Sequence, residues 1–403
     1  MSTILLYHGV YKKKLLGIEN YSCKHIEEKI FEKQIKWLRK NCELVNLKQF
    51  FSEINNNTKK KKKLVSITFD DSYKNVYTNA LPILNKYEVP ATFFINTGFI
   101  NNSKLYWTDV LEAIFNSSEK KEFFFEAPSF SKKKYDISTN KKKIRTIIFI
   151  KNKLKKIKKR EREQIVNIIK KKLNITNSKL FLSKNYKTLN WSEVKKIDKN
   201  KKYEIGGHST NHENLSILNE TELEIEIDQC INVLEKKLKR KINLFSYPEG
   251  EFNNFVIKKL KKKKIKICPT TKPGINTKKV SSFHLKRYTP GFMNQNFPFN
   301  LPNKLANVSN NSSAIFDFSN IRPIKINKGT ATSSSFVIVP NIFDGISARK
   351  SMLNKSNRDA TSANKIETPA KVNATGKPNN KKQKVITNIS TLNISLVIFN
   401  QLI

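Results

Sequence analysis

The 403-residue sequence has few cysteines, no long apolar run and only a short apolar segment at its start. None of its four cysteines forms a Cys-x-x-Cys pair, so neither a zinc knuckle nor a disulfide framework is expected. No run of about 18 apolar residues is present, so we expect no membrane-spanning helix. The first apolar segment, at positions 4–7, is too short for the core of a secretory signal. We therefore expect a cytoplasmic protein, with peripheral association with the cell envelope left open.

Acidic residues are also scarce. The chain has 33 Asp and Glu against 77 Lys and Arg, a formal net charge of +44. A charge of this sign suits nucleic acid or an anionic surface. However, the lysine runs at 59–63, 151–160 and 258–264 are scattered and have no interleaved aromatic residues or nucleic-acid motif. A general bias towards Lys, Asn and Ile accounts for them, so we expect no specific nucleic-acid partner.

Two adjacent carboxylates end an apolar stretch in the first quarter of the chain. Residues 64–69 have the length and β-branched content of a buried parallel strand, and Asp70 and Asp71 follow directly. The C-terminal ends of such strands are where α/β folds place their chemistry. Neighbouring carboxylates repel, and a divalent metal would stabilise the pair, with one as ligand and the other free to accept a proton from water. A turn with both carboxylates in solvent is the alternative.

Histidines are few as well, five in all, yet His208 and His212 lie four positions apart after a short apparent strand. On a helical turn or a compact loop, this spacing presents both imidazoles to one side. One Asp oxygen and two His nitrogens make a three-ligand set with an open position, typical of catalytic rather than structural zinc sites. Two surface histidines are the alternative. A third stretch, 242–250, ends in an aromatic residue, Pro and Gly; it is either an ordinary turn or one that exposes backbone N–H groups to an oxyanion.

Strand and helix patterns alternate along most of the chain. Strand patterns at 4–8, 64–69 and 91–96 enclose helix patterns at 26–40 and 73–87, which predicts a parallel sheet or an α/β barrel. An amphipathic helix is expected at 221–238, and the last strands at 265–269 and 284–288. Residues 101–187 interrupt this order. We interpret them as a helical insertion that either caps the site or lines a substrate groove.

The last hundred residues have a different composition. Residues 301–403 are rich in Asn, Ser, Thr and Lys and show no sustained period of 2 or 3.6. We predict a largely disordered, low-complexity tail after a domain at 1–300.

Taken together, these stretches resemble the polysaccharide deacetylase family, also called the NodB-homology domain or carbohydrate esterase family 4, over about residues 1–295. The family motif Thr-Phe-Asp-Asp-Gly matches 68–72 with Ser72 in place of Gly, and His-[Ser/Thr]-x-x-His matches 208–212. Phe-Ala-Tyr-Pro-x-Gly matches 245–250 with Ser246 in place of Ala. The segments Leu6-Tyr7-His8 and Trp107-Thr108-Asp109 are also similar to one branch of this family.

The resemblance implies an irregular (β/α)7 barrel, similar to the TIM barrel. It also implies a metal-dependent hydrolase that removes N-acetyl groups from an N-acetylated polysaccharide, oligosaccharide or glycan precursor. Asp70 takes the place of the general base. The metal, usually Zn²⁺, is bound at the places of Asp71, His208 and His212. The turn of Tyr247, Pro248 and Glu249 takes the oxyanion place through a backbone N–H.

Two departures from the family pattern affect the expected mechanism. Ser246 stands where an Arg often orients the base, and Arg287 stands where a His usually protonates the leaving amine. Arg cannot release a proton near neutral pH, so Arg287 could instead pair with Asp70. His8 and His284 are then the candidate general acids. Because of these changes, a catalytically silent glycan-binding relative is an alternative, as is a non-sugar amidase, since a fold does not fix its substrate.

Overall fold

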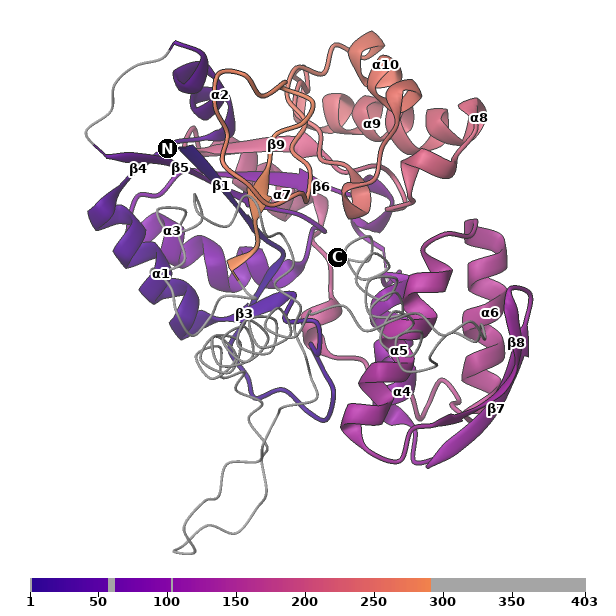
Figure 1. Cartoon of the computed structure of the whole chain (residues 1–403). Coiled ribbons are helices and arrows are strands. Elements are labelled where there is room, and N and C mark those ends of the chain that lie inside the picture. The colour runs from indigo at the N-terminus through magenta and orange to yellow at the C-terminus, as the bar shows by residue number, and fades with distance from the viewer. Residues whose placement is uncertain (1, 57–61, 103, 291–403) are drawn as a thin grey trace, which may run out of the picture. The chain divides into compact units, whose positions relative to one another are not determined.

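The computed structural model describes residues 2–56, 62–102 and 104–290 (Figure 1). Its central feature is a parallel sheet with the strand order β10-β1-β5-β6-β9. These strands are β1 (Ser2–Tyr7), β5 (Lys63–Phe69), β6 (Ala91–Ile95), β9 (Tyr203–Gly207) and β10 (Arg287–Tyr288). A short strand, β4 (Cys42–Leu44), pairs with the first half of β5, while β6 pairs with its second half.

Three isolated parallel bridges close this sheet into a ring. They pair Gly207 with Phe245, Leu244 with Ile267, and Pro269 with Leu285, which lies just before β10. Within the described residues, the ring therefore contains seven parallel segments: β1, β5, β6, β9, 244–245, 267–269 and 285–288. This confirms the predicted α/β fold, an irregular (β/α)7 barrel similar to the TIM barrel. All seven C-terminal ends lie at the same rim.

Amphipathic helices pack around the strands and bury their apolar faces (Figure 1). β5 is buried along nearly its whole length, as expected for a parallel strand covered on both faces. The helices are α1 (Glu28–Asn41), α2 (Leu47–Asn55), α3 (Leu81–Lys86), α7 (Trp191–Lys199), α8 (Glu220–Leu223), α9 (Gln229–Leu238) and α10 (Asn254–Lys262). π-helical turns η1 (Val76–Ala80) and η5 (Glu224–Asp228) precede α3 and α9, and β2 (Gly9–Tyr11) pairs with β3 (His25–Glu27).

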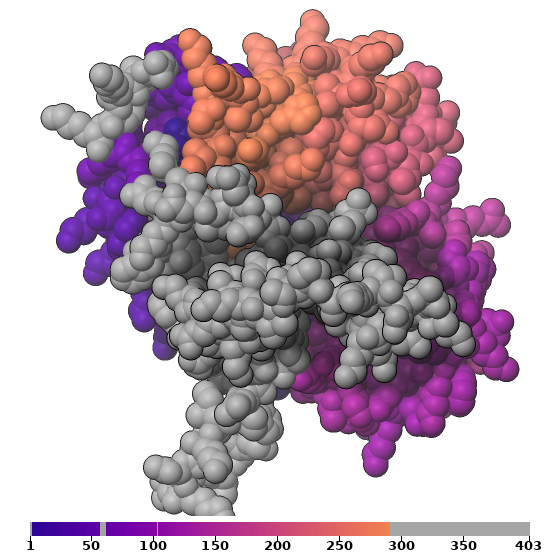
Figure 2. Space-filling view, in the orientation of Figure 1, coloured from indigo at the N-terminus to yellow at the C-terminus, as the bar shows by residue number. Residues whose placement is uncertain are grey.

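Residues 101–187, called the insertion below, lie between β6 and α7 in the sequence and build a second apolar core. They form α4 (Trp107–Ser117), an antiparallel hairpin of β7 (Glu122–Ala127) and β8 (Phe130–Asp136), α5 (Asn140–Leu154) and α6 (Lys159–Lys172). In the space-filling view the insertion is the magenta lobe beside the salmon surface of the later helices (Figure 2). The sequence analysis predicted a helical insertion and did not anticipate this hairpin, which packs Phe123 and Phe125 inward and leaves Phe124 exposed.

Two further predictions concern membrane-spanning helices and the C-terminal tail. Among the described residues, no helix has both the length and the apolar character needed to cross a membrane. The predicted tail, residues 301–403, lies outside the described residues.

Candidate metal centre

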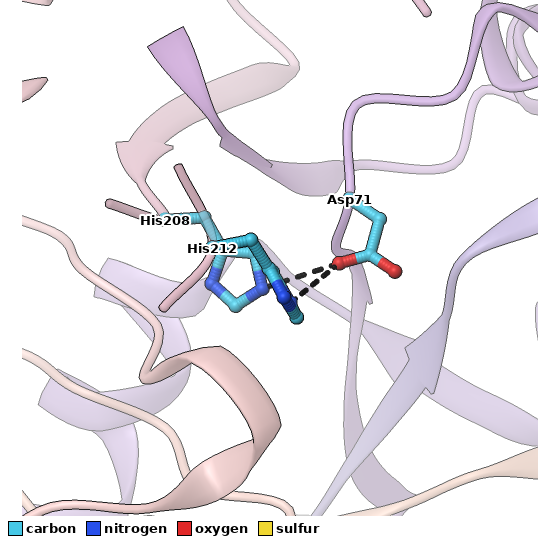
Figure 3. Close-up of side chains that lie close together, drawn as sticks. All are labelled: Asp71, His208 and His212. Atoms are coloured by element: carbon cyan, nitrogen blue, oxygen red, sulfur yellow. Dashed lines mark ion pairs between the residues drawn. The ribbon is translucent and has the colours of Figure 1, made fainter. Parts of the chain in front are cut away.

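The three sequence-predicted ligands meet at the C-terminal rim of the barrel. Asp71 follows β5, and His208 and His212 lie in the loop after β9, two places along the ring. Asp71 Oδ1 lies 3.4 Å from His208 Nε2 and 3.1 Å from His212 Nε2 (Figure 3). One ligand atom from each side chain falls within 4.8 Å of the other two. The strand order thus brings together residues that are far apart in the sequence.

The hydrogen bonds around this cluster fit a bound cation. His208 Nδ1 lies 2.8 Å from the carbonyl oxygen of Ser246, which can only accept, so Nδ1 donates to it and Nε2 is the ring atom directed at Asp71. Asp71 Oδ1 is buried and has no well-oriented hydrogen-bond donor among the described residues. Two imidazoles and a carboxylate directed at one point form a suitable donor set for zinc and related divalent ions. The residues present therefore fit a metal centre.

The charges within the cluster shift its pKa values. Burial alone would raise the pKa of Asp71, but His212 and His208 outweigh it and hold that pKa well below its ordinary value. Burial lowers the pKa of His212, whereas the carboxylate of Asp71 raises it, and the net direction is upward. Asp71 is therefore ionised across the neutral range, as a metal ligand must be.

The loops that carry the ligands have an unusual backbone conformation. Asp71 has a φ of 71°, Ser72 of 54°, Ser209 of 64° and His212 of 59°. Such left-handed non-glycine residues each cost about 1–3 kcal/mol and require surrounding contacts to hold them. The Ser72 hydroxyl accepts the N–H of Asn96 at 2.8 Å, and the Ser209 hydroxyl accepts the N–H of His212 at 2.9 Å. The positive φ at Ser72 explains why glycine suits this position.

Asp70, the predicted base, is held by Arg287. The buried guanidinium donates from Nη1 to Asp70 Oδ1 at 2.9 Å and from Nη2 to Oδ2 at 2.7 Å. Its other donors reach Ser246 Oγ, Thr68 Oγ1 and the carbonyl of Thr270, so all five N–H groups are used. The structure thus forms the Arg287–Asp70 pair that the sequence allowed.

This pair keeps the base ionised and next to the ligands. Burial on its own would raise the pKa of Asp70, but the Arg287 guanidinium outweighs it and holds that pKa below its ordinary value. Asp70 Oδ2 also accepts from Ser246 Oγ at 3.1 Å and lies 3.8 Å from His208 Nε2. Ser246 therefore contacts the base directly, while Arg287 supplies the charge from β10.

The two candidate general acids lie in different places. His8 follows β1 at the rim, and its Nδ1 is buried without a hydrogen-bond partner in the described part of the chain. Burial lowers the pKa of His8, while the charges of Asp71 and Asp70 act to raise it, so it lies within their electrostatic reach. His284 is exposed, and its ring packs 5.2 Å from that of Phe252. The structure brings His8 but not His284 to the carboxylates.

The predicted oxyanion turn lies beside Ser246. Pro248 and Gly250 begin and end a 3₁₀ turn in which Glu249 has a φ of 58°. The Tyr247 hydroxyl donates to the carbonyl of Phe283 at 3.2 Å. Within the described residues, no hydrogen bond is found from the backbone N–H of Tyr247, which leaves this group free for an oxyanion.

Sequence reasoning missed several residues around the ligands. Tyr106 packs the edge of its ring on His212 at 5.4 Å, and its hydroxyl bonds Asn96 at 2.9 Å and the carbonyl of Asp71. Asn96 in turn donates to the carbonyl of His208. Its position directly after β6 could have revealed it, since polar residues follow each neighbouring strand at this rim.

A buried network behind Tyr106 was also missed. Lys24 Nζ lies 2.5 Å from the Tyr73 hydroxyl and 2.6 Å from Asp109 Oδ1, and Tyr73 donates to Asp109 Oδ2 at 2.6 Å. Asp109 belongs to the segment whose likeness to the family was noted, but nothing in the sequence marked Lys24.

Comparisons with known proteins identify a family and related sequences. The family model "Polysaccharide deacetylase" matches residues 57–268, more than half of the chain. A poly-β-1,6-N-acetyl-D-glucosamine N-deacetylase of Staphylococcus aureus (strain MSSA476) is 35% identical over 132 residues, which cover 30% of this chain and 43% of that protein. The protein of the same name from Staphylococcus epidermidis is 34% identical over 119 residues, 27% of this chain and 40% of that protein. The matches thus span less than half the length of these relatives.

Among solved structures, the Streptococcus pyogenes deacetylase PplD in complex with acetate superposes with a TM-score of 0.47 at 16% identity, over 71% of this chain and 91% of that chain. The family match includes the Asp70–Asp71 strand end and the His208–His212 loop, whose side chains meet in the fold. The chain belongs to the polysaccharide deacetylase family.

Proposed function

We propose that this protein is a metal-dependent hydrolase that removes N-acetyl groups from an N-acetylated glycan. The observation that carries the proposal is the position of Asp70. A carboxylate that is kept ionised by Arg287 lies next to a three-ligand set of one Asp and two His. Such a pairing of base and metal ligands is suited to hydrolysis of an amide, whose carbonyl is a poor electrophile. Poly-β-1,6-N-acetyl-D-glucosamine, named for the staphylococcal relatives, is the first substrate to test.

Asp71, His208 and His212 would hold the divalent ion, which we propose is Zn²⁺ because two imidazoles and a carboxylate suit it. When bound, this ion supplies the positive charge that polarises an acetamide carbonyl and makes a water molecule more acidic. The Nδ1 contact of His208 with Ser246 fixes the ring with Nε2 directed at Asp71, so that Nε2 would be the ligand atom.

The chain's own groups then act in order. Asp70 accepts the proton of the attacking water, while Arg287 holds its carboxylate in place and keeps it ionised. The N–H of Tyr247 donates a hydrogen bond to the oxyanion that forms from the carbonyl oxygen. His8 gives a proton to the leaving amine, because it is the candidate acid that lies near both aspartates. Acetate and the free amino sugar are the products.

Acetate release from a panel of acetylated compounds tests the proposal. The panel contains β-1,6-linked and β-1,4-linked N-acetylglucosamine oligomers and a non-sugar acetamide, with Asp70→Asn as control. We expect acetate from at least one oligomer with the wild-type protein, and a loss of that activity in the variant. Oligomer binding without acetate would contradict the proposal and favour a glycan-binding protein. Acetate from the non-sugar acetamide alone would favour an amidase.

A further inference from the structure

The insertion contacts the ligand loop through a buried arginine. Arg162 lies on α6, and its Nη2 donates to Glu213 Oε1 at 2.6 Å and to Oε2 at 2.7 Å. The exposed fractions of the two side chains are only 5% and 9%. Glu213 directly follows His212, so the insertion is tied to the residue next to a candidate metal ligand.

Residues at the start of α4 contact the ligand loop and Arg162 as well. Tyr106 packs against His212 with ring centroids 5.4 Å apart, and the next residue, Trp107, lies 5.1 Å from the guanidinium of Arg162. Tyr106 therefore supports His212 directly, and Trp107 supports the next loop residue, Glu213, through Arg162. Both helices belong to the insertion's own core, which makes them a rigid support.

The barrel holds the other side of this loop through the carboxylate of Glu226. The carboxylate of Glu226 accepts from the backbone N–H and the side-chain amide of Asn211, each at 2.8 Å. At Glu213 the donor is instead a cationic guanidinium, which holds a carboxylate more strongly than the neutral amide groups of Asn211 do. His212, between these two anchors, has a left-handed backbone that requires such contacts.

We propose that Arg162 is a positioning residue, which fixes His212 in the metal centre through Glu213 and so makes the insertion part of that centre. The proposal rests on the metal centre of the proposed function. It predicts that the pair affects how tightly and in what geometry a metal binds, because partners that orient ligands typically contribute about 10–100-fold to affinity.

Titration of the metal-free protein with Co²⁺, followed by its visible absorption, tests this role. The variants are Arg162→Met, Arg162→Lys and Glu213→Gln, the double variant Arg162→Met/Glu213→Gln, and His212→Ala. The control is Arg240→Met, which removes an Arg–carboxylate pair with Asp198 on another part of the surface. We expect Co²⁺ affinity to fall about 10–100-fold in Arg162→Met with a changed spectrum, and less in Arg162→Lys, which keeps the charge. Arg240→Met should stay within about twofold of wild type, as should its spectrum.

Arg162→Met leaves the Glu213 carboxylate buried without its partner, which destabilises the fold. The double variant removes this carboxylate as well, so it keeps the proposal testable if Arg162→Met does not fold. Because Arg162 and Glu213 act as a unit, the two substitutions should not add. The double variant should therefore bind Co²⁺ at least as tightly as the weaker binder of the two single variants, Arg162→Met and Glu213→Gln. Wild-type-like affinity and spectrum in folded Arg162→Met or in the double variant, with binding lost in His212→Ala, would overturn the role of Arg162 and leave the metal centre intact. Absence of Co²⁺ binding by the wild type would overturn the metal centre itself, and the role of Arg162 with it.

Discussion

At the scale of single residues, Asp70 and Asp71 are neighbours in the chain but face different partners. Asp70 is bound by the guanidinium of Arg287, whereas Asp71 faces the Nε2 atoms of His208 and His212. Both pKa values are lowered, the first by a permanent cation and the second by the imidazoles. These environments suit different tasks: a fixed, ionised base and a metal ligand.

The two asparagine variants should therefore fail differently. Asp70→Asn keeps the shape and removes the basicity, so metal content should be unchanged while turnover falls by about 10²–10⁴. Asp71→Asn removes a charged ligand, so metal affinity itself should fall. Metal content measured beside acetate release for each purified variant checks this. A metal-free Asp70→Asn together with a metal-replete Asp71→Asn would show that the roles are reversed.

Arg287 should matter for stability as well as for orientation of the base. Arg287→Met leaves the Asp70 carboxylate buried without its partner, which should lower the free energy of unfolding by about 3–5 kcal/mol. Arg240→Met, which breaks the more exposed pair with Asp198, should cost about 1 kcal/mol or less. Urea unfolding of both variants beside wild type measures the difference. Equal losses in the two variants would contradict the account of Arg287.

The sequence predicted those residues of the candidate centre that are marked by their spacing or by a departure from the family motif. The His208–His212 spacing and the Asp70–Asp71 strand end identified the cluster, and an Arg in the place of a His pointed to the Arg287–Asp70 pair. The sequence left the choice between His8 and His284 as general acid open, because it depends on which segments of the closed ring lie near the carboxylates. The contribution of Lys24 could not be predicted either, since it comes from a loop with no pattern.

At the scale of elements, the barrel strands were predictable and the hairpin was not. The central strands β5 and β6 are apolar runs that end in polar residues, which the sequence shows directly. The hairpin lacks alternation, because β7 contains three successive Phe and β8 three successive exposed Lys. Its strand character comes from packing on α5 and α6, which the local sequence pattern does not show.

The helix α4 provides a test of how the insertion is joined to the N-terminal loop. The buried Glu112 carboxylate accepts the N–H of Asn20 at 2.8 Å and the hydroxyl of Tyr186. Burial raises the pKa of Glu112 to about 7, although these hydrogen bonds act to lower it. Because the folded pKa lies above the unfolded one, the stability from this group is present below about pH 4.5 and is lost as the pH rises through about 7.

Glu112→Gln should remove this pH dependence. The free energy of unfolding of wild type relative to the variant should fall by about 3 kcal/mol between pH 4.5 and pH 8. Urea unfolding of both proteins at several pH values over this range gives the difference. A constant difference across the range would mean that the pKa of Glu112 is not raised in the folded protein, and would contradict this account.

At the scale of the whole molecule, composition carries little information about function. The net charge of +44 comes from lysines spread along the chain, whereas the candidate centre is built from aspartates, histidines and one arginine brought together by the strand order. Such a centre appears only when distant segments are placed on one ring. The low-complexity tail at 301–403 lies outside the described residues, and the cytoplasmic location of the protein likewise stays a prediction.

The central claim is that Asp71, His208 and His212 hold the metal that makes this chain a deacetylase. The most direct measurement is acetate release from a β-1,6-linked N-acetylglucosamine oligomer by metal-stripped protein, during stepwise addition of Zn²⁺. The account predicts almost no activity at the start and a linear rise that levels off near one Zn²⁺ per chain, with no rise in His208→Ala/His212→Ala. Full acetate release by the stripped wild-type protein, or an equal rise in the double variant, would contradict it.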